Sequence, residues 1–287
     1  MRKITTYIVA LFSVIVLFSS CKKEYETMEE LDNKNISAYV ASTGQTFSDG
    51  EGGYKYRIID AGTGSAVLNS DSVYYSYTFK STSGKVYNQT SDLMIPGTFL
   101  GYTDQFAIGN SAYSFKPVRE VLAKLNRGGK ATLVLPSRMA FGKNGLSNFG
   151  IGSNEVIVVD LGLYTYEKRH EVDAYEIPTF ISRNNLTFNT DVSGIRYNVI
   201  TPGTGTDMIS EFSTLVVNYT GRYLDGTVFD SGTGVTFRLD QLVKGWQLIL
   251  PDRITAGGKI RIIIPSHLAY GARPLDFDIE VTTVTNN

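Results

Sequence analysis

The sequence has few of the residues that usually carry catalysis by a metal ion or a nucleophile. Its 287 residues include one cysteine, Cys21, and two histidines, His170 and His267, which lie far apart in the sequence. A single cysteine excludes an internal disulfide bond, and two isolated histidines give no support for a histidine-rich metal site. We therefore expect no bound metal ion or cofactor.

The chain also lacks an excess of charge and a long apolar run. There are 27 Lys and Arg against 28 Asp and Glu, so no basic surplus is available to bind phosphates, and we expect no nucleic-acid partner. The apolar run at residues 7–18 is shorter than the about 20 residues that a membrane-spanning helix needs. The 18 Tyr, 15 Phe and 28 Gly that are present favour a sheet-rich fold with many turns.

Residues 1–20 have the pattern of a secretory signal peptide. A basic start precedes the apolar run, and the small residues Ser19 and Ser20 stand directly before Cys21. This end resembles the lipobox of bacterial lipoproteins, which implies that Cys21 is lipidated and anchors the protein to a membrane without spanning it. The alternative is a buried or incidental cysteine. Residues 21–34 are charged and poor in apolar residues, so we expect a lipidated N-terminus and a solvated tether.

Two copies of one unit follow the tether. Residues of the same type recur in the same order, at offsets of 141, 142, 129 and finally 118 positions. We infer two homologous domains, residues 35–167 and 168–287. The first has about a dozen additional residues near residues 93–102. The matching pairs include Tyr39/Phe180, Phe47/Phe188, Tyr56/Tyr197, Tyr77/Tyr219, Pro136/Pro265, Ser137/Ser266 and Asp160/Asp278.

Each copy predicts the same series of elements. A short lead segment, a helical turn at most, is followed by strands, one short helix and two long strands. The apolar run at residues 259–264 indicates a central strand, and strict alternation of apolar and polar residues indicates a second long strand. The expected elements are lead segments at 36–40 and 177–183, helices at 117–125 and 239–246, and strands at 259–264 and 275–282.

The most specific pattern lies between Val216 and Gly232. It predicts a strand, a turn at Asp225–Gly226 and a return strand that ends in Phe229–Asp230, because Asp-Gly between apolar runs is a strong hairpin signal. The order Val-x-Tyr-Thr-Gly, Asp-Gly, Phe-Asp-Ser resembles the signature of FKBP-type peptidyl-prolyl isomerases. The resemblance covers nearly all of residues 195–285. It implies an α+β fold with two FKBP-like domains, each an antiparallel sheet curled around one short helix.

The resemblance also implies a proline pocket in the second copy. Trp246 would form its floor, Leu242 and Val243 two aliphatic walls, and Tyr270 would donate a hydrogen bond to the substrate. Rotation about an X–Pro bond breaks no covalent bond, so no nucleophile or metal is needed. Singly, several of these residues are ordinary core residues, and their joint order favours a site. The implied site residues are Tyr219, Phe229, Asp230, Phe237 (in the strand after the hairpin), Leu242, Val243, Trp246, Tyr270 and Phe277.

The first copy lacks most of this set. Tyr87–Asn88 stands in place of Phe-Asp, Phe141 in place of the second pocket Tyr, and Val159 about where the closing Phe would be. No Trp occurs near residues 115–118, although a long flap-like loop remains at residues 143–155. We expect no catalysis in this domain and assign it a spacer or binding role.

The second copy departs from the family at its flap. Only Ala272–Pro274 separate Gly271 from Leu275, where members usually carry a longer loop over the proline. The intact aromatic set favours an isomerase or folding helper for proline-containing exported polypeptides, whereas the short flap favours a non-catalytic module that binds peptides or proteins. In either case the resemblance implies a lipoprotein in the cell envelope of a diderm, Bacteroides-like bacterium.

Overall fold

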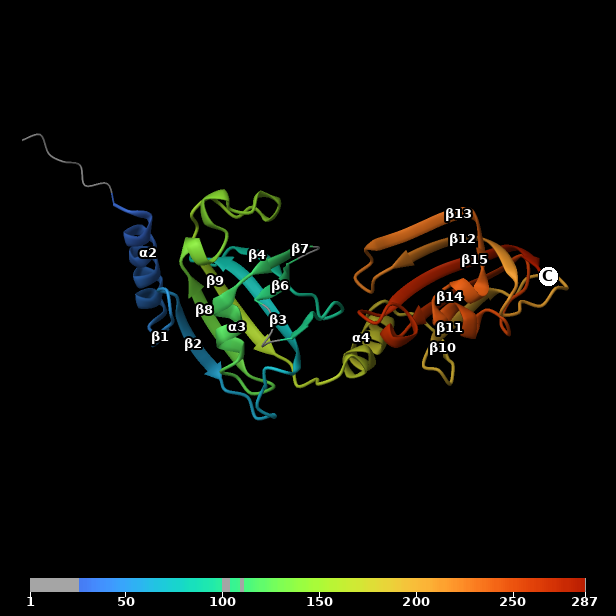
Figure 1. The fold of residues 1–287 in the computed structure, drawn as a ribbon, viewed down its shortest axis with the longest axis horizontal. Coiled ribbons are helices and arrows are strands. Elements are labelled where there is room, and N and C mark those ends of the chain that lie inside the picture. Colours follow the sequence, from blue (N-terminus) through green and yellow to red (C-terminus); the bar gives the residue numbers. More distant parts are fainter. Residues whose placement is uncertain (1–25, 100–103, 109–110, 287) are drawn as a thin grey trace, which may run out of the picture.

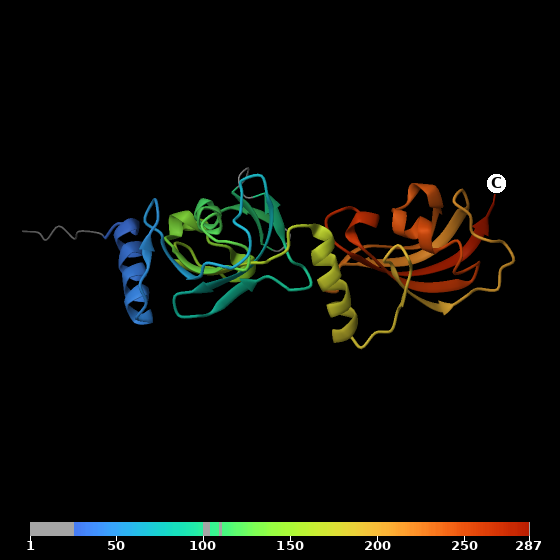
Figure 2. The ribbon, with the colours of Figure 1, turned by 90° about the horizontal axis from the view of Figure 1, so that it is seen from below.

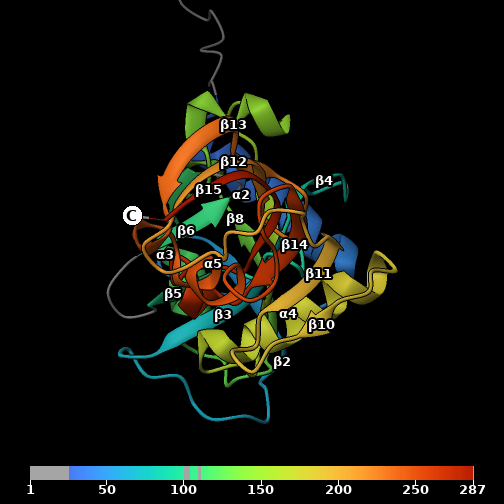
Figure 3. The same cartoon turned by 90° about the vertical axis from the view of Figure 1, so that its right-hand side faces the viewer.

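The computed structural model of the chain describes residues 26–99, 104–108 and 111–286. The signal peptide expected at residues 1–20 and the lipidation expected at Cys21 lie outside these residues. Within them, no helix combines the length and apolarity needed to cross a membrane. Two β-sheets follow one another along the long axis of the molecule (Figures 1 and 2). Viewed along that axis, the C-terminal half stands in front of the N-terminal half (Figure 3).

The described part of the N-terminal half contains a large antiparallel sheet, a separate two-stranded sheet of β6 and β7, and two helices. Its strands have the order β1-β2-β8-β9-β3-β4, and β5 adds to one end of β3. The bounds are α2 Met28–Thr43, β1 Ser48–Asp49, β2 Lys55–Asp60, β3 Ser72–Ser81, β4 Val86–Gln89, β5 Gly97–Phe99, β6 Gln105–Ile108, β7 Ser111–Ser114, α3 Lys116–Leu122, β8 Lys130–Leu135 and β9 Ile157–Leu163.

The C-terminal half repeats this arrangement. Its sheet has the order β10-β11-β14-β15-β12-β13, which matches the first sheet strand for strand. The bounds are α4 Arg169–Arg183, β10 Asn189–Thr190, β11 Arg196–Thr201, β12 Thr214–Arg222, β13 Val228–Arg238, α5 Lys244–Ile249, β14 Gly258–Ile264 and β15 Leu275–Thr285, with 3₁₀ turns at Leu239–Gln241 and Ser266–Leu268.

The centre of the second sheet is formed by the strands that were predicted as long and apolar. β14 lies between β11 and β15, and β15 lies between β14 and β12. Ile260, Ile262 and Ile264 are fully buried, as are alternate residues of β15 such as Ile279 and Val281. The predicted strands at 259–264 and 275–282 are thus confirmed. The alternation of β15 buries one face against α5 and leaves the other polar.

The lead segments are complete helices, which corrects the expectation of single helical turns. α2 begins at Met28 behind a capping box between Thr27 and Glu30, and α4 spans 15 residues. Each half therefore contains two helices in its described part, not one. The prediction that residues up to 34 form a solvated tether is also wrong, because residues 28–34 belong to α2 and Asp32 is buried.

Both lead helices are held by the same buried contact. Oδ2 of Asp32 accepts hydrogen bonds from the backbone N–H and the hydroxyl of Ser137, at 2.9 and 2.8 Å. Oδ2 of Asp173 accepts the equivalent pair from Ser266, at 2.8 and 2.6 Å. A buried carboxylate is destabilising unless such donors compensate for lost water, so these bonds fix each helix on the turn that follows the central strand. The sequence showed a charged residue here but not its partner.

Helix α4 contacts the N-terminal half as well as its own. The backbone N–H of Ile95 donates to Oε1 of Glu176 at 2.7 Å, and Arg183 donates to Asp92 at 2.7 Å. Val172 of α4 packs with Ile95 and the ring of Tyr74 in one buried cluster. The additional segment of the first domain therefore docks on the lead helix of the second. Figures 1 and 2 both show α4 between the two sheets.

We predict that Asp173→Ala lowers the free energy of unfolding of the full chain by about 2 kcal/mol, because it leaves the buried donors of Ser266 without an acceptor. Denaturant unfolding followed by circular dichroism measures this change. Asp252→Ala, which removes an exposed carboxylate, is the matched control and should be neutral. Equal unfolding midpoints for the two variants would contradict the role assigned to the Asp173–Ser266 contact.

Candidate functional site

The C-terminal half carries an apolar hollow between α5, β13 and the turn after β14. Eight of the nine predicted site residues line it. Phe229 does not, but its ring packs edge-on against that of Phe277, with centroids 5.6 Å apart, and so supports the wall from behind. The lining residues are Tyr219, Asp230, Phe237, Gln241, Leu242, Val243, Trp246, Tyr270 and Phe277. We call this hollow the aromatic pocket.

Trp246 forms the floor of the aromatic pocket. It is 3% exposed, and the rings of Tyr219 and Phe277 meet its indole edge-on at centroid distances of 5.8 and 5.3 Å. Edge-to-face contacts place the positive rim of one ring against the negative face of another, which fixes ring orientation. Gly245 precedes the Trp because a Cβ there would come within 2.4 Å of Ile264. The glycine thus allows α5 to lie close to β14.

The wall of the pocket depends on a second close approach, at Gly221. A Cβ at this position would lie 2.6 Å from Cε1 of Phe277 and 2.8 Å from Cζ of Phe229. Carbon atoms do not approach so closely, so any side chain here would push both rings away. The Thr-Gly of the sequence motif therefore has a steric role in the site.

The polar groups of the pocket lie at its rim. The hydroxyl of Tyr219 donates to Oδ2 of Asp230 at 2.9 Å. Burial, reinforced by this hydrogen bond to a carboxylate, raises the pKa of Tyr219 to about 12. Tyr270 is 73% exposed, so its hydroxyl is free to meet a ligand. The rim thus offers one fixed polar pair and one exposed donor above an apolar floor.

Two features of the site were not anticipated from the sequence. Gln241 lines the pocket, although only its neighbours Leu242 and Val243 were selected as walls. Phe237 lies on the same strand as Phe229, β13, and not on a following strand. The expectation was wrong because β13 continues through two register shifts against β12, where bulges bend the strand instead of ending it.

The N-terminal half has a different residue arrangement at the equivalent place. In β3 and β9, Phe79 lies opposite Val159, whereas in β12 and β15 Gly221 lies opposite Phe277. The large ring therefore comes from one strand in the first half and from its neighbour in the second. Val159 does stand where the closing Phe of the second copy lies, as the sequence alignment of the repeats indicated.

The ring of Phe79 fills the space that is open in the second half. It is 2% exposed and lies within 4.9 to 6.0 Å, between centroids, of the rings of Tyr77, Phe115 and Phe141. These rings pack together, and the set contains neither a Trp nor an exposed Tyr. In the described part of the first half, the place of the aromatic pocket is therefore filled by the ring of Phe79.

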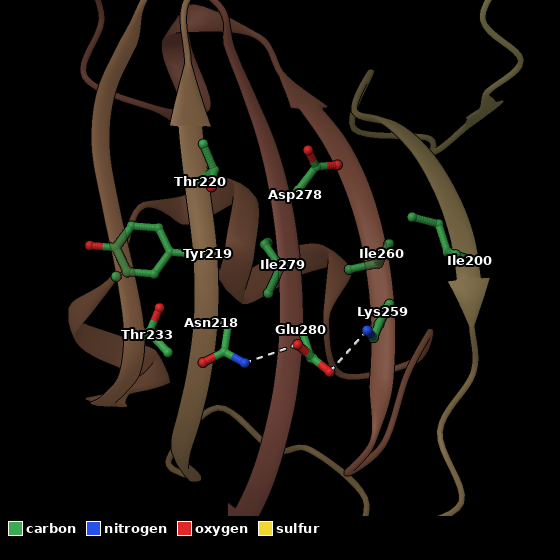
Figure 4. Close-up of a pocket in the computed structure, with 11 residues that line it drawn as sticks. Ile200, Asn218, Tyr219, Thr220, Thr233, Lys259, Ile260, Asp278, Ile279 and Glu280 are labelled. Atoms are coloured by element: carbon green, nitrogen blue, oxygen red, sulfur yellow. Dashed lines mark hydrogen bonds and ion pairs between the residues drawn. The ribbon is translucent and has the colours of Figure 1, made fainter.

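A second, more polar depression lies on the opposite face of the second sheet (Figure 4). Glu280 accepts from Asn218 at 2.9 Å and pairs with Lys259 at 3.1 Å, across three neighbouring strands. These groups satisfy one another, so the depression presents no free charge from this set. Across the described residues, no group of three or more His, Cys, Asp or Glu is placed to hold a metal ion.

The sequence of this half matches the family model described as FKBP-type peptidyl-prolyl cis-trans isomerase, over residues 205–282. Residues 205–282 thus resemble this family in sequence, and we call the C-terminal half the FKBP-type domain. The matched segment contains all nine predicted site residues. The N-terminal half lies outside the matched residues.

Known relatives resemble part of the chain. The chain is 35% identical over 114 residues to the outer membrane protein MIP of Legionella longbeachae, and 37% identical over 108 residues to the isomerase FkpA of Escherichia coli K12. These matches cover 38% and 33% of this chain, and only 48% and 39% of the relatives. The chain therefore spans less than half the length of either relative.

Two solved structures are similar to parts of the chain. A peptidyl-prolyl cis-trans isomerase from Pseudomonas syringae is 31% identical, with 40% of this chain and 96% of that one covered and a TM-score of 0.36. FkpA from Escherichia coli is 23% identical, with 57% and 71% covered and a TM-score of 0.37. Because both TM-scores are low, the family assignment rests on the sequence match.

We predict that Asp230→Asn lowers the pKa of Tyr219 from about 12 toward its ordinary value of 10, because the charged acceptor that holds the proton is lost. Absorbance at 295 nm against pH measures this, with Tyr219→Phe to identify the signal. Since the folded pKa is the higher, the contact stabilises the fold fully below pH 10 and is lost as the pH rises through 12. An unchanged titration in Asp230→Asn would show that burial alone sets the pKa.

Proposed function

We propose that the FKBP-type domain catalyses cis-trans isomerisation of X–Pro peptide bonds in polypeptides that bind the aromatic pocket. The observation that carries this proposal is the joint placement of Tyr219, Trp246, Tyr270 and Phe277 around one hollow in a domain of this family. The pocket presents an apolar floor, two aliphatic walls and a polar rim. This is the arrangement that small apolar ligand sites usually have.

The proposed chemistry is conformational. Amide resonance sets a barrier of about 18–20 kcal/mol, and the planar amide is more charge-separated than the twisted one. An apolar pocket that excludes water therefore destabilises the planar form relative to the twisted form. Only interactions that are stronger in the twisted state accelerate the reaction. The indole of Trp246 holds the pyrrolidine ring, and the exposed hydroxyl of Tyr270 donates to a carbonyl next to the rotating bond.

Asp230 acts through Tyr219. Its carboxylate fixes the Tyr219 hydroxyl and leaves the ring edge-on to Trp246, so the aromatic wall is preorganised. No proton transfer is assigned to this pair, because Tyr219 keeps its proton up to about pH 11 with a pKa of about 12. We therefore expect isomerisation to vary little between pH 7 and pH 9.

Isomerisation of a short proline peptide by the full-length chain tests the proposal. We predict that Trp246→Phe and Asp230→Ala each lower kcat/KM about tenfold, which corresponds to about 1.4 kcal/mol of lost stabilisation. The exposed His267, which lies three residues before Tyr270 but does not line the pocket, provides the control His267→Ala. A wild-type rate equal to the uncatalysed rate would overturn the proposed activity, and equal rates in all variants would overturn the site assignment.

One observation favours a second candidate, a module that binds proline-containing segments without accelerating rotation. The turn after Tyr270 is short, and the Tyr270 ring is exposed instead of covered. Catalysis benefits from exclusion of water, which a longer flap would improve. Peptide binding by fluorescence anisotropy without any rate enhancement would support this alternative.

We further propose that the protein works on exported polypeptides while anchored to the envelope through a lipid at Cys21. The leader sequence supports this proposal, and a relative of the FKBP-type domain is named an outer membrane protein. Slow prolyl isomerisation, over tens of seconds, limits the folding of exported chains, so an anchored catalyst would act where it is needed.

We predict that Cys21→Ser moves the chain from the membrane fraction to the soluble fraction. An unchanged distribution on fractionation would refute the anchor.

A further inference from the structure

The turn that replaces the flap faces the N-terminal half of the chain. Gly271, Ala272 and Arg273 line a second hollow together with Ile95 and β5 of that half. Tyr270, one residue earlier, lines the aromatic pocket. The second hollow, which we call the interdomain cleft, therefore adjoins the aromatic pocket at Tyr270–Gly271.

The walls of the interdomain cleft are preformed. Ile95 is 1% exposed and is bonded through both backbone groups: its N–H donates to Glu176 at 2.7 Å, and its carbonyl accepts from Arg169 at 3.2 Å. Glu176 and Arg169 both belong to α4, the first helix of the FKBP-type domain. The wall that Ile95 contributes from the first domain is therefore fixed to the second domain. A ligand that enters the cleft thus meets walls already in place, which reduces the entropy lost on binding.

The charge of the cleft is one-sided. Two arginines line it and no carboxylate does. Arg169 is neutralised by Asp173, at 2.8 Å, and by Glu176. Arg273, in contrast, has no carboxylate within 4 Å among the described residues, although it lines a neighbouring hollow together with Asp225. It contacts the ring of Tyr223 at 5.6 Å and Sδ of Met94 at 3.8 Å. Arg273 is therefore a half-buried cation with its charge available to a ligand.

Exposed aromatic side chains occur on both sides of the junction. Phe99 of β5 lines the cleft and is 55% exposed, and Tyr270 lines the pocket and is 73% exposed. Large aromatic side chains left in water next to a hollow are typical of surfaces that bind a partner chain. The same path thus offers an apolar floor, two open rings and one free guanidinium.

We propose that a polypeptide held by its proline in the aromatic pocket continues over Tyr270 into the interdomain cleft, where Arg273 binds an acidic side chain of that polypeptide. This inference rests on the proposed function and specifies its substrate class: proline segments with a Glu or Asp a few residues from the proline. It gives the N-terminal half a role without a pocket of its own, as one wall of an extended substrate site. Contacts in the cleft, remote from the rotating bond, then bind the substrate in place of contacts that a longer flap would make.

The inference is tested on the full-length chain with a series of peptides. Each peptide has one proline and a single Glu, Gln or Lys, and this residue is moved in turn to each position on both sides of the proline. At the favoured position we expect kcat/KM for the Glu peptide to exceed that for the Gln peptide about fivefold, as for a partly exposed ion pair. Arg273→Gln should abolish this preference, and Arg273→Glu should transfer it to the Lys peptide. Lys34→Gln, which removes an equal charge from α2 at the far end of the first half, should leave it unchanged.

A short proline peptide without flanks separates this inference from the proposed activity. Wild-type isomerisation of this peptide measures the proposed activity alone, because the short peptide does not reach the cleft. If the wild type isomerises the short peptide but treats Glu, Gln and Lys peptides alike, the inference is overturned and the activity stands. If no isomerisation occurs, anisotropy of fluorescein-labelled Glu and Gln peptides still tests the cleft. If the wild type then binds the Glu and Gln peptides equally, as Arg273→Gln is expected to do, the inference is overturned.

Discussion

The absence of a side chain at Gly221 is the constraint on which the aromatic pocket depends. Only there can the rings of Phe229 and Phe277 lie directly over the backbone of β12, which leaves the indole of Trp246 uncovered at the bottom of a hollow. In the N-terminal half the equivalent position is Phe79, whose ring occupies that space. The two sheets have the same strand order but differ at this place, because the large ring is on β3 in the first half and on β15 in the second.

The Asp–Ser contacts connect this local difference to the whole molecule. Asp173 docks α4 on the turn that continues into Tyr270 and the short segment after it. The same helix also receives the additional segment of the first half, through the hydrogen bond between Glu176 and Ile95. The insertion in one copy and the shortened flap in the other, which are separate irregularities in the sequence, thus lie on either side of the same cleft.

Much of the fold was predictable because it follows from short-range patterns in the sequence. These patterns are the alternation of β15, the apolar run of β14 and the Asp225–Gly226 turn. The repeat allows each of them to be compared with a second copy. The lead helices were underestimated for a physical reason. α2 is stabilised by a capping box and by burial of Asp32 against a serine 105 positions away, and no local pattern encodes that contact.

By itself, the sequence determined the types of residue in the pocket and their order. Tyr219, Asp230, Trp246 and Tyr270 follow a family pattern that can be recognised in the sequence alone. Only the tertiary structure decided that eight of the nine line one hollow, that Phe229 supports it from behind, and that Phe79 closes the other copy. It also decided that Arg273 has no carboxylate within 4 Å in the part of the chain that the structure describes. These facts depend on distances between residues far apart in the chain, and ring packing and charge pairing are set by those distances.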